Sequence, residues 1–203
     1  MLQINGGYMN KLVVSAFVVL LLMTTILSAQ NGFVLPKGWH AAGSKPAEFE
    51  MGIDRTTYQN GKSSVCIKSK DPKGNDFGTV MQYIVAENYL GKRLKLSGYI
   101  KSSGVEGWCG MWMRIDGESG LQLGFDNMSG RSIRGTNDWK KYEIVLDVPS
   151  ASKAIAFGVL LGGKGKVWFD NMKIEEVDKS VPVTNLMREM SNLKEPVNLD
   201  LEE

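Results

Sequence analysis

The chain has 203 residues, with 24 Lys and Arg against 22 Asp and Glu, giving a formal net charge of +2. This length suits one domain with a tail. The near-balance of charge argues against a strongly basic nucleic-acid binder. One histidine and two cysteines argue against a zinc site built from His and Cys alone, because such a site needs three or four of these ligands close together.

An uncharged apolar run over residues 12–29 follows Lys11 near the start of the chain. This pattern predicts a secretory signal peptide over 1–29, cleaved after Ala29. The alternative is an uncleaved membrane anchor, because the run is just long enough to span a bilayer. We therefore expect a secreted or periplasmic protein that has no membrane contact after signal cleavage and no nucleic-acid partner.

Short runs of alternating apolar and polar residues follow, separated by Gly, Asn, Asp or Pro. No stretch between about residues 38 and 177 keeps a helical apolar stripe for three turns, so parallel βαβ units are not expected. The pattern predicts an all-β fold over residues 30–178, a two-sheet antiparallel β-sandwich of the jelly-roll type. The clearest runs are SVCIKS, TVMQYIVA, RLKLSGYIKS, CGMWMRID, LQLGFDN, KKYEIVLDVP, AIAFGVLLG and KVWFDNMKIEEV.

Alternation also assigns side chains to the two faces of each strand. We expect the apolar sets to point between the sheets and the mixed sets to face solvent. The apolar sets are Leu94, Leu96 and Ile100; Cys109, Met111, Met113 and Ile115; and Leu121, Leu123 and Phe125.

The mixed sets suggest a binding face. Trp112 and Arg114 lie two residues apart, and Tyr99, Gln122 and Asp126 would join them if their strands are neighbours. An aromatic ring stacks on the apolar face of a sugar, and a guanidinium suits hydroxyls or carboxylates. The alternative is a tryptophan packed under a loop, with the arginine covering its ring.

Cys66 and Cys109 both lie in strand-like runs. In an exported protein they could form a disulfide, or they could be two buried thiols. Residues 179–203 contain two prolines and a short stretch, 185–193, that could form a helix. We interpret this segment as a linker or a loosely docked tail.

Three stretches carry a resemblance to a known group: GKRLKLSGYIKS (91–102), GTNDWKKYEIVLDVP (135–149) and AIAFGVLLGGKGKVWFDNMKIE (154–175). They resemble the carbohydrate-binding-module-like domains of bacterial secreted proteins, which have a galactose-binding-like jelly-roll fold. The resemblance covers about residues 38–177 and implies this fold. It says little about a ligand, because the shared residues are turn and core positions. Residues 196–203 resemble the opening strand of such a domain, either as the stub of a second module or as a docked strand.

The resemblance also bears on metal binding and on two tryptophans. An acid at the position of Asp170 often joins early-strand acids in a structural calcium site, and Glu50 is a candidate companion beside Glu48 and Asp54. Trp139 and Trp168 occupy positions that are mostly structural in the resembling domains. No cofactor other than this calcium is expected.

Motifs for catalysis are missing. Glu48 and Glu50 share a strand face but lack the carboxylate spacing of jelly-roll glycosidases, and no nucleophile elbow or phosphate loop is present. We expect a secreted, non-catalytic module that binds a carbohydrate or polyhydroxyl ligand on an open sheet face. The alternative is a protein-interaction or accessory module of a larger cell-envelope system. A glycosidase or lyase is a third reading.

Overall fold

The structure, a computed structural model, describes residues 33–185. The expected signal peptide and residues 186–203 of the tail lie outside the described residues. Within this range no helix is long and apolar enough to span a membrane. The strands are β1 (His40–Gly43), β2 (Phe49–Asp54), β3 (Ser64–Ser69), β4 (Phe77–Val85), β5 (Arg93–Asp116), β6 (Gln122–Asp126), β7 (Ile133–Asp147), β8 (Ala154–Gly162) and β9 (Lys166–Val177).

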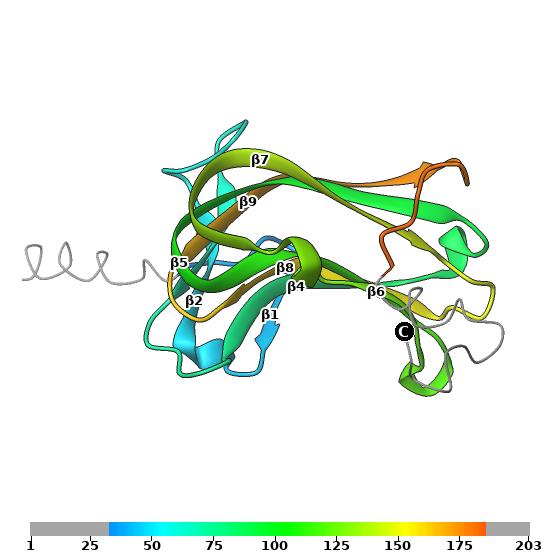
Figure 1. Ribbon diagram of the computed structural model, residues 1–203, viewed down its shortest axis with the longest axis horizontal. Helices are drawn as coiled ribbons and strands as arrows, with labels where there is room; N and C mark the ends of the chain where they lie inside the picture. The colour runs from blue at the N-terminus through cyan, green and yellow to red at the C-terminus, as the bar shows by residue number, and fades with distance from the viewer. Residues whose placement is uncertain (1–32, 186–203) are drawn as a thin grey trace, which may run out of the picture. The chain divides into compact units, whose positions relative to one another are not determined.

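The strands form two layers that share β5 (Figure 1). The first half of β5 pairs with β7 on one side and β9 on the other, and β3 and β2 continue that sheet. The second half pairs with β6 and β8, followed by β4 and β1. Every one of these pairings is antiparallel. The predicted all-β sandwich is confirmed.

The passage of β5 between the sheets occurs over a short irregular segment. Its register against β7 shifts three times between Ile100 and Cys109. Gly104 in this segment has a φ of 59°, a left-handed conformation that glycine adopts without steric cost. The chain therefore turns from one layer to the other while remaining hydrogen-bonded as a strand.

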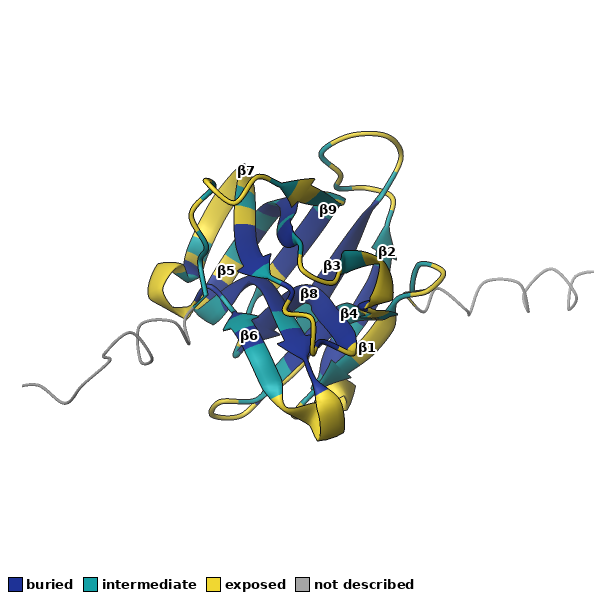
Figure 2. Ribbon diagram, turned by 90° about the vertical axis from the view of Figure 1, so that its right-hand side faces the viewer, coloured by how far each residue is buried: buried dark blue, intermediate teal, exposed yellow. Residues whose placement is uncertain are grey.

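The core lies between the two halves of β5. Leu94 and Leu96 from the first half, and Met111, Met113 and Ile115 from the second, are completely buried. The buried positions concentrate on the strands in the middle of the domain, and exposed positions on the turns (Figure 2). The predicted inward faces of both β5 segments are confirmed.

The two cysteines are free thiols on different sides of a sheet. Cys109 belongs to the central core, whereas Cys66 pairs with Trp168 on the outer side of β3. Burial raises the pKa of each thiol to about 12. Both cysteines are therefore buried thiols, and the disulfide alternative is not the one adopted.

The predicted inward and outward faces are wrong for the last two residues of β6, Phe125 and Asp126. The register against β5 shifts so that Leu123 is an extra residue between two paired positions. Such a bulge reverses the alternation. Phe125 pairs with the outward-facing Arg114, and Asp126 pairs with the buried Met113. Phe125 is thus on the outer face and Asp126 is buried, the opposite of the expectation.

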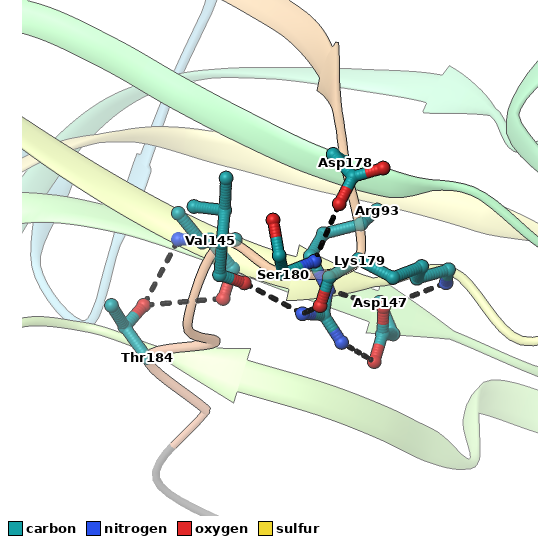
Figure 3. Close-up of polar contacts among 8 residues, drawn as sticks. Arg93, Val145, Asp147, Asp178, Lys179, Ser180 and Thr184 are labelled. Carbon is teal, nitrogen blue, oxygen red and sulfur yellow. Dashed lines mark hydrogen bonds and ion pairs between the residues drawn. The ribbon is translucent and has the colours of Figure 1, made fainter.

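The first part of the tail is held firmly at Arg93 (Figure 3). The Arg93 guanidinium donates two hydrogen bonds of 2.9 Å to the Asp147 carboxylate. Its remaining nitrogen donates to the carbonyls of Lys179 and Val181, the latter at 2.6 Å. One buried arginine therefore joins the start of β5, the end of β7 and the segment after β9.

The tail then crosses to the other sheet (Figure 1). The Thr184 amide donates to the Val145 carbonyl of β7 at 2.8 Å, and the Val145 amide donates to the Thr184 hydroxyl at 3.0 Å. The side-chain oxygen of Asn185 accepts from the Phe125 amide of β6 at 3.1 Å. Residues 179–185 are therefore docked on the sandwich.

The core assignment predicts the cost of a truncation. Met113→Ala should lower the free energy of unfolding by about 2–5 kcal/mol, because it leaves a cavity between the two sheets. Leu121→Ala, at a position 64% exposed, is the matched control and should change it by less than about 0.5 kcal/mol. Urea denaturation measures both. Equal costs for the two variants would contradict the position of the core.

The Arg93 contacts predict a pH dependence. Hydrogen bonds from Arg93 hold the pKa of Asp147 at about 2, below its ordinary 3.8. A carboxylate with a lowered pKa stabilises the fold fully at pH values above its ordinary pKa. This stabilisation is lost as the pH falls through the lowered pKa. The stability difference between the parent and Asp147→Asn should be constant above pH about 4 and shrink towards pH about 2. Urea denaturation along this range tests it.

The control is Glu118→Gln, which removes an exposed carboxylate paired with Lys153. This variant should give a much smaller pH-dependent difference, because exposed ion pairs contribute little. A difference between the parent and Asp147→Asn that stays the same down to pH about 2 would contradict the role of the charge.

Candidate functional site

A cleft of about 490 Å³ opens on the outer face of the second sheet. Small residues form part of its lining, Ala42 and Gly43 of β1 and Gly162 of β8, and they leave space above the strands. Its aromatic side chains are Phe77, Trp108, Trp112 and Phe125. Its polar side chains are Asn75, Thr79, Arg114 and Asn127.

Trp112 forms the floor of this cleft. Its indole nitrogen donates to the Thr79 hydroxyl at 2.8 Å, so the ring bridges β8, the strand between β5 and β4. The same hydroxyl donates to the carbonyl of Val159 at 2.8 Å. Trp112 is only 8% exposed, and it packs with Ala156 and Leu160. The expectation of an accessible Trp112 is wrong, because its polar group is satisfied inside the sheet.

Arg114 lies two residues after Trp112 on β5, on the same face of the strand. Its guanidinium donates to both carboxylate oxygens of Asp116, at 2.7 and 2.9 Å. The arginine side chain is 41% exposed, and that of Asp116 is 8% exposed. Phe125 of β6 is the residue that pairs with Arg114 of β5, and Trp108 lies on the same face of β5 as Arg114. Trp112 and Arg114 are thus brought together in the cleft as predicted, though only Arg114 is well exposed.

The other three predicted ligand-binding residues do not line the cleft. Tyr99 is on the first sheet, opposite Lys141 and Asp170, on its outer face. Gln122 pairs with Asp116 at the far end of β6. Asp126 is buried and holds a turn.

The carboxylate of Asp126 has a structural set of partners. It accepts hydrogen bonds from the Met128 amide at 2.8 Å and from Arg131 at 2.7 and 3.1 Å. Because the β6 bulge turns this side chain inward, it stabilises the turn after β6 and does not face the cleft.

Several cleft residues escaped the sequence reasoning. Trp108 is four residues before Trp112, so strand alternation from Trp112 would have placed both on one face. Phe77 alternates in the same way with Thr79 on β4. Asn75 and Asn127 lie in turns, where alternation gives no information. Only strand pairing brings these segments to one cleft.

The two residues proposed as the main calcium ligands, Glu50 and Asp170, do not lie together. Glu50 pairs with Lys68, which pairs with Lys166, so Glu50 is level with a position four residues before Asp170. That spacing along β9 is roughly 13 Å. Asp170 accepts from the amides of Gln59 and Asn60, at 3.0 and 3.1 Å. Within residues 33–185, no three His, Cys, Asp or Glu side chains gather as metal ligands do.

Trp168 and Trp39 have structural surroundings. The Trp168 indole donates to Asp54 at 2.8 Å, and the residue is 9% exposed. Trp39 contacts the rings of Phe157 and Phe169, with centroids 5.9 and 5.5 Å away. Neither tryptophan lines the cleft.

The chain has curated relatives, although no protein-family model matches it. It is 51% identical over 168 residues to the uncharacterized HTH-type transcriptional regulator YbfP of Bacillus subtilis. The match covers 82% of this chain and 57% of the relative, so the chain spans little more than half of that protein. It is 27% identical over 174 residues to the tRNA(Glu)-specific nuclease WapA of Bacillus subtilis subsp. natto, covering 80% of this chain and 7% of the relative.

Solved structures share the fold at low identity. The CBM22-1 xylan-binding domain of Paenibacillus barcinonensis Xyn10C matches with a TM-score of 0.53 and 14% identity, covering 72% of this chain and 90% of that domain. The enzymatically active domain of bacteriophage CBA120 tailspike protein 4 matches with a TM-score of 0.54 and 12% identity, over 70% of this chain and 20% of that one. This chain therefore has the jelly-roll fold found in carbohydrate-binding modules.

The buried setting of Trp112 predicts a large structural cost. Trp112→Ala should lower the free energy of unfolding by about 3–5 kcal/mol, because it empties the floor of the cleft. Trp112→Phe should cost about 1–3 kcal/mol, since it keeps much of the packing and removes one buried hydrogen bond. Tyr83→Ala, 59% exposed on the same sheet, is the control and should have little effect. Denaturation that found Trp112→Ala as stable as this control would contradict the assignment.

Proposed function

We propose that this domain is a non-catalytic binding module whose cleft on the second sheet holds a carbohydrate or related polyhydroxyl ligand. The observation that carries the proposal is the composition of the cleft, with four aromatic side chains beside two amides and a guanidinium. Aromatic rings stack on the C–H faces of sugars, while amides and guanidinium groups bond hydroxyls. The volume of about 490 Å³ suits a small ligand or a few sugar units.

Two further observations support this proposal. The fold is shared with a domain described as xylan-binding. The described cleft lining contains no Asp, Glu, His or Cys side chain, so the carboxylate pair used by glycosidases is not found there. A binding role is favoured over hydrolysis. The apolar run over residues 12–29, which predicts a signal peptide, supports a role for such a module outside the cytoplasm.

A second candidate function follows from the relative that is named as a transcriptional regulator. At 51% identity, the matching portion of that protein would have the same sandwich fold. In this reading the cleft senses a small polyhydroxyl ligand for a larger polypeptide, as a regulatory or accessory module. Both readings place the ligand in the same cleft, and they differ in whether binding serves attachment or signalling.

The structure of the cleft predicts that one aromatic side chain contributes to ligand affinity but little to the stability of the fold. Trp108 is half-buried at the edge of the cleft. Trp108→Ala should lower affinity roughly tenfold, equivalent to about 1–2 kcal/mol of lost stacking. It should lower the melting temperature less than Trp112→Ala. A glycan array identifies the ligand, and calorimetry with the best glycan measures the affinities.

The matched control is Trp139→Ala, a half-buried tryptophan on β7 in the other sheet. It should leave glycan affinity unchanged. A parent protein that binds no glycan, or a Trp108→Ala variant with parental affinity, would contradict the proposed site.

A further inference from the structure

The charge in the cleft is confined to one ion pair. Among its described lining residues, Arg114 alone carries a charged side chain. That charge faces the carboxylate of Asp116 at 2.7 Å. Besides Asp126, which is paired with Arg131, the charged residues that adjoin lining residues in sequence are two cations and two carboxylates, Lys73, Lys164, Asp76 and Glu106, so they add no net charge. A ligand therefore meets a cationic group that is already neutralised.

The pair is built into the sheet before any ligand arrives. Arg114 and Asp116 are two residues apart on one strand, so their side chains share a face. The backbone of Asp116 is held between β8 and β6, opposite Ala154 and Gln122. Its carbonyl also accepts from the Lys153 amide at 2.7 Å. The carboxylate is thus fixed against the guanidinium, with both oxygens occupied.

This arrangement discriminates between ligands by charge. An anionic group that approached Arg114 would place a second carboxylate beside Asp116, and the three charges would sum to −1. Like charges repel strongly in a partly buried site, and an anion also loses its hydration there. A neutral hydroxyl meets neither cost, because it can accept a hydrogen bond from the exposed part of the guanidinium.

We propose that Asp116 is a specificity-determining residue, which neutralises Arg114 and so restricts the cleft to uncharged polyhydroxyl ligands. This inference rests on the proposed carbohydrate-binding function. It excludes sugars that bear carboxylate, sulfate or phosphate groups, although an arginine in an aromatic cleft would by itself favour them. This specificity comes from a repulsive group, the Asp116 carboxylate, which disfavours anionic ligands.

The first experiment uses the parent protein on a glycan array that holds neutral and uronic-acid-containing oligosaccharides. Bound glycans should be neutral at the recognised units, and affinity should change less than about twofold between about 50 mM and 500 mM sodium chloride. Preferential binding of acidic glycans, or strong weakening by salt, would overturn the inference but not the proposed function. Binding of no glycan at all would overturn both.

The second experiment removes the neutralising charge. Asp116→Asn keeps the side-chain shape and leaves the Arg114 charge uncompensated. Its affinity for uronic-acid oligosaccharides, relative to neutral ones, should rise at least tenfold, and this gain should be lost at high salt. Asp138→Asn is the matched control, since it removes the exposed partner of Lys101 on the other sheet. It makes the same change in net charge and should not alter the selectivity.

Thermal melting shows whether Asp116→Asn is folded. A folded Asp116→Asn variant with parental selectivity would overturn the inference. So would an Asp138→Asn variant that gained acidic ligands to the same extent, because the effect would then come from net charge. If Asp116→Asn does not fold, the salt dependence and the array profile of the parent decide the question.

Discussion

The architecture depends on one strand that belongs to two sheets. The 24 residues of β5 pair with β7 and β9 in their first half and with β6 and β8 in their second. Each half sends alternate side chains into the same interior, so a single strand supplies much of the core. The central layers are joined covalently as well as by packing, and displacement of β5 would disrupt both sheets at once.

The cleft follows from the outer side of the second half of β5. When Met111 and Met113 point inward, Trp108, Trp112 and Arg114 must point outward. Trp112 crosses β8 to reach Thr79. Gly158, the residue of β8 that pairs with Trp112, has no space for a side chain, because an added Cβ would be only 2.3 Å from the Val80 carbonyl. The floor is thus fixed by the same backbone pairing that closes the core.

Two arginines, near the first and last residues of β5, show two uses of an arginine–carboxylate ion pair. Arg93 is nearly buried, and its pairing with Asp147 also holds the segment that follows β9 (Figure 3). Arg114 is open to the cleft, and its pairing with Asp116 leaves the guanidinium available without leaving a net charge. In each case the planar fork of arginine, with donors in a fixed geometry, engages both carboxylate oxygens.

The sequence by itself determined the strands and most of the core. Alternation of apolar residues along RLKLSGYIKS and CGMWMRID predicted the buried faces of β5, because side chains on a strand point to opposite sides in turn. The same rule placed Trp112 and Arg114 on one outer face. The resemblance to carbohydrate-binding-module-like domains added the jelly-roll fold, which the two sheets and the solved structures confirm.

Only the tertiary structure decided what depends on pairing between distant segments. The bulge at Leu123 reversed the faces of β6 and moved Phe125 into the cleft, and no local pattern marks that extra residue. The burial of Trp112 depends on Thr79, which is 33 residues away along the chain. Tyr99 satisfied the alternation rule but belongs to the other sheet. Alternation assigns a side chain to a face of its own strand, whereas the neighbours of that face are set by strand order and register, and these form only when the chain folds.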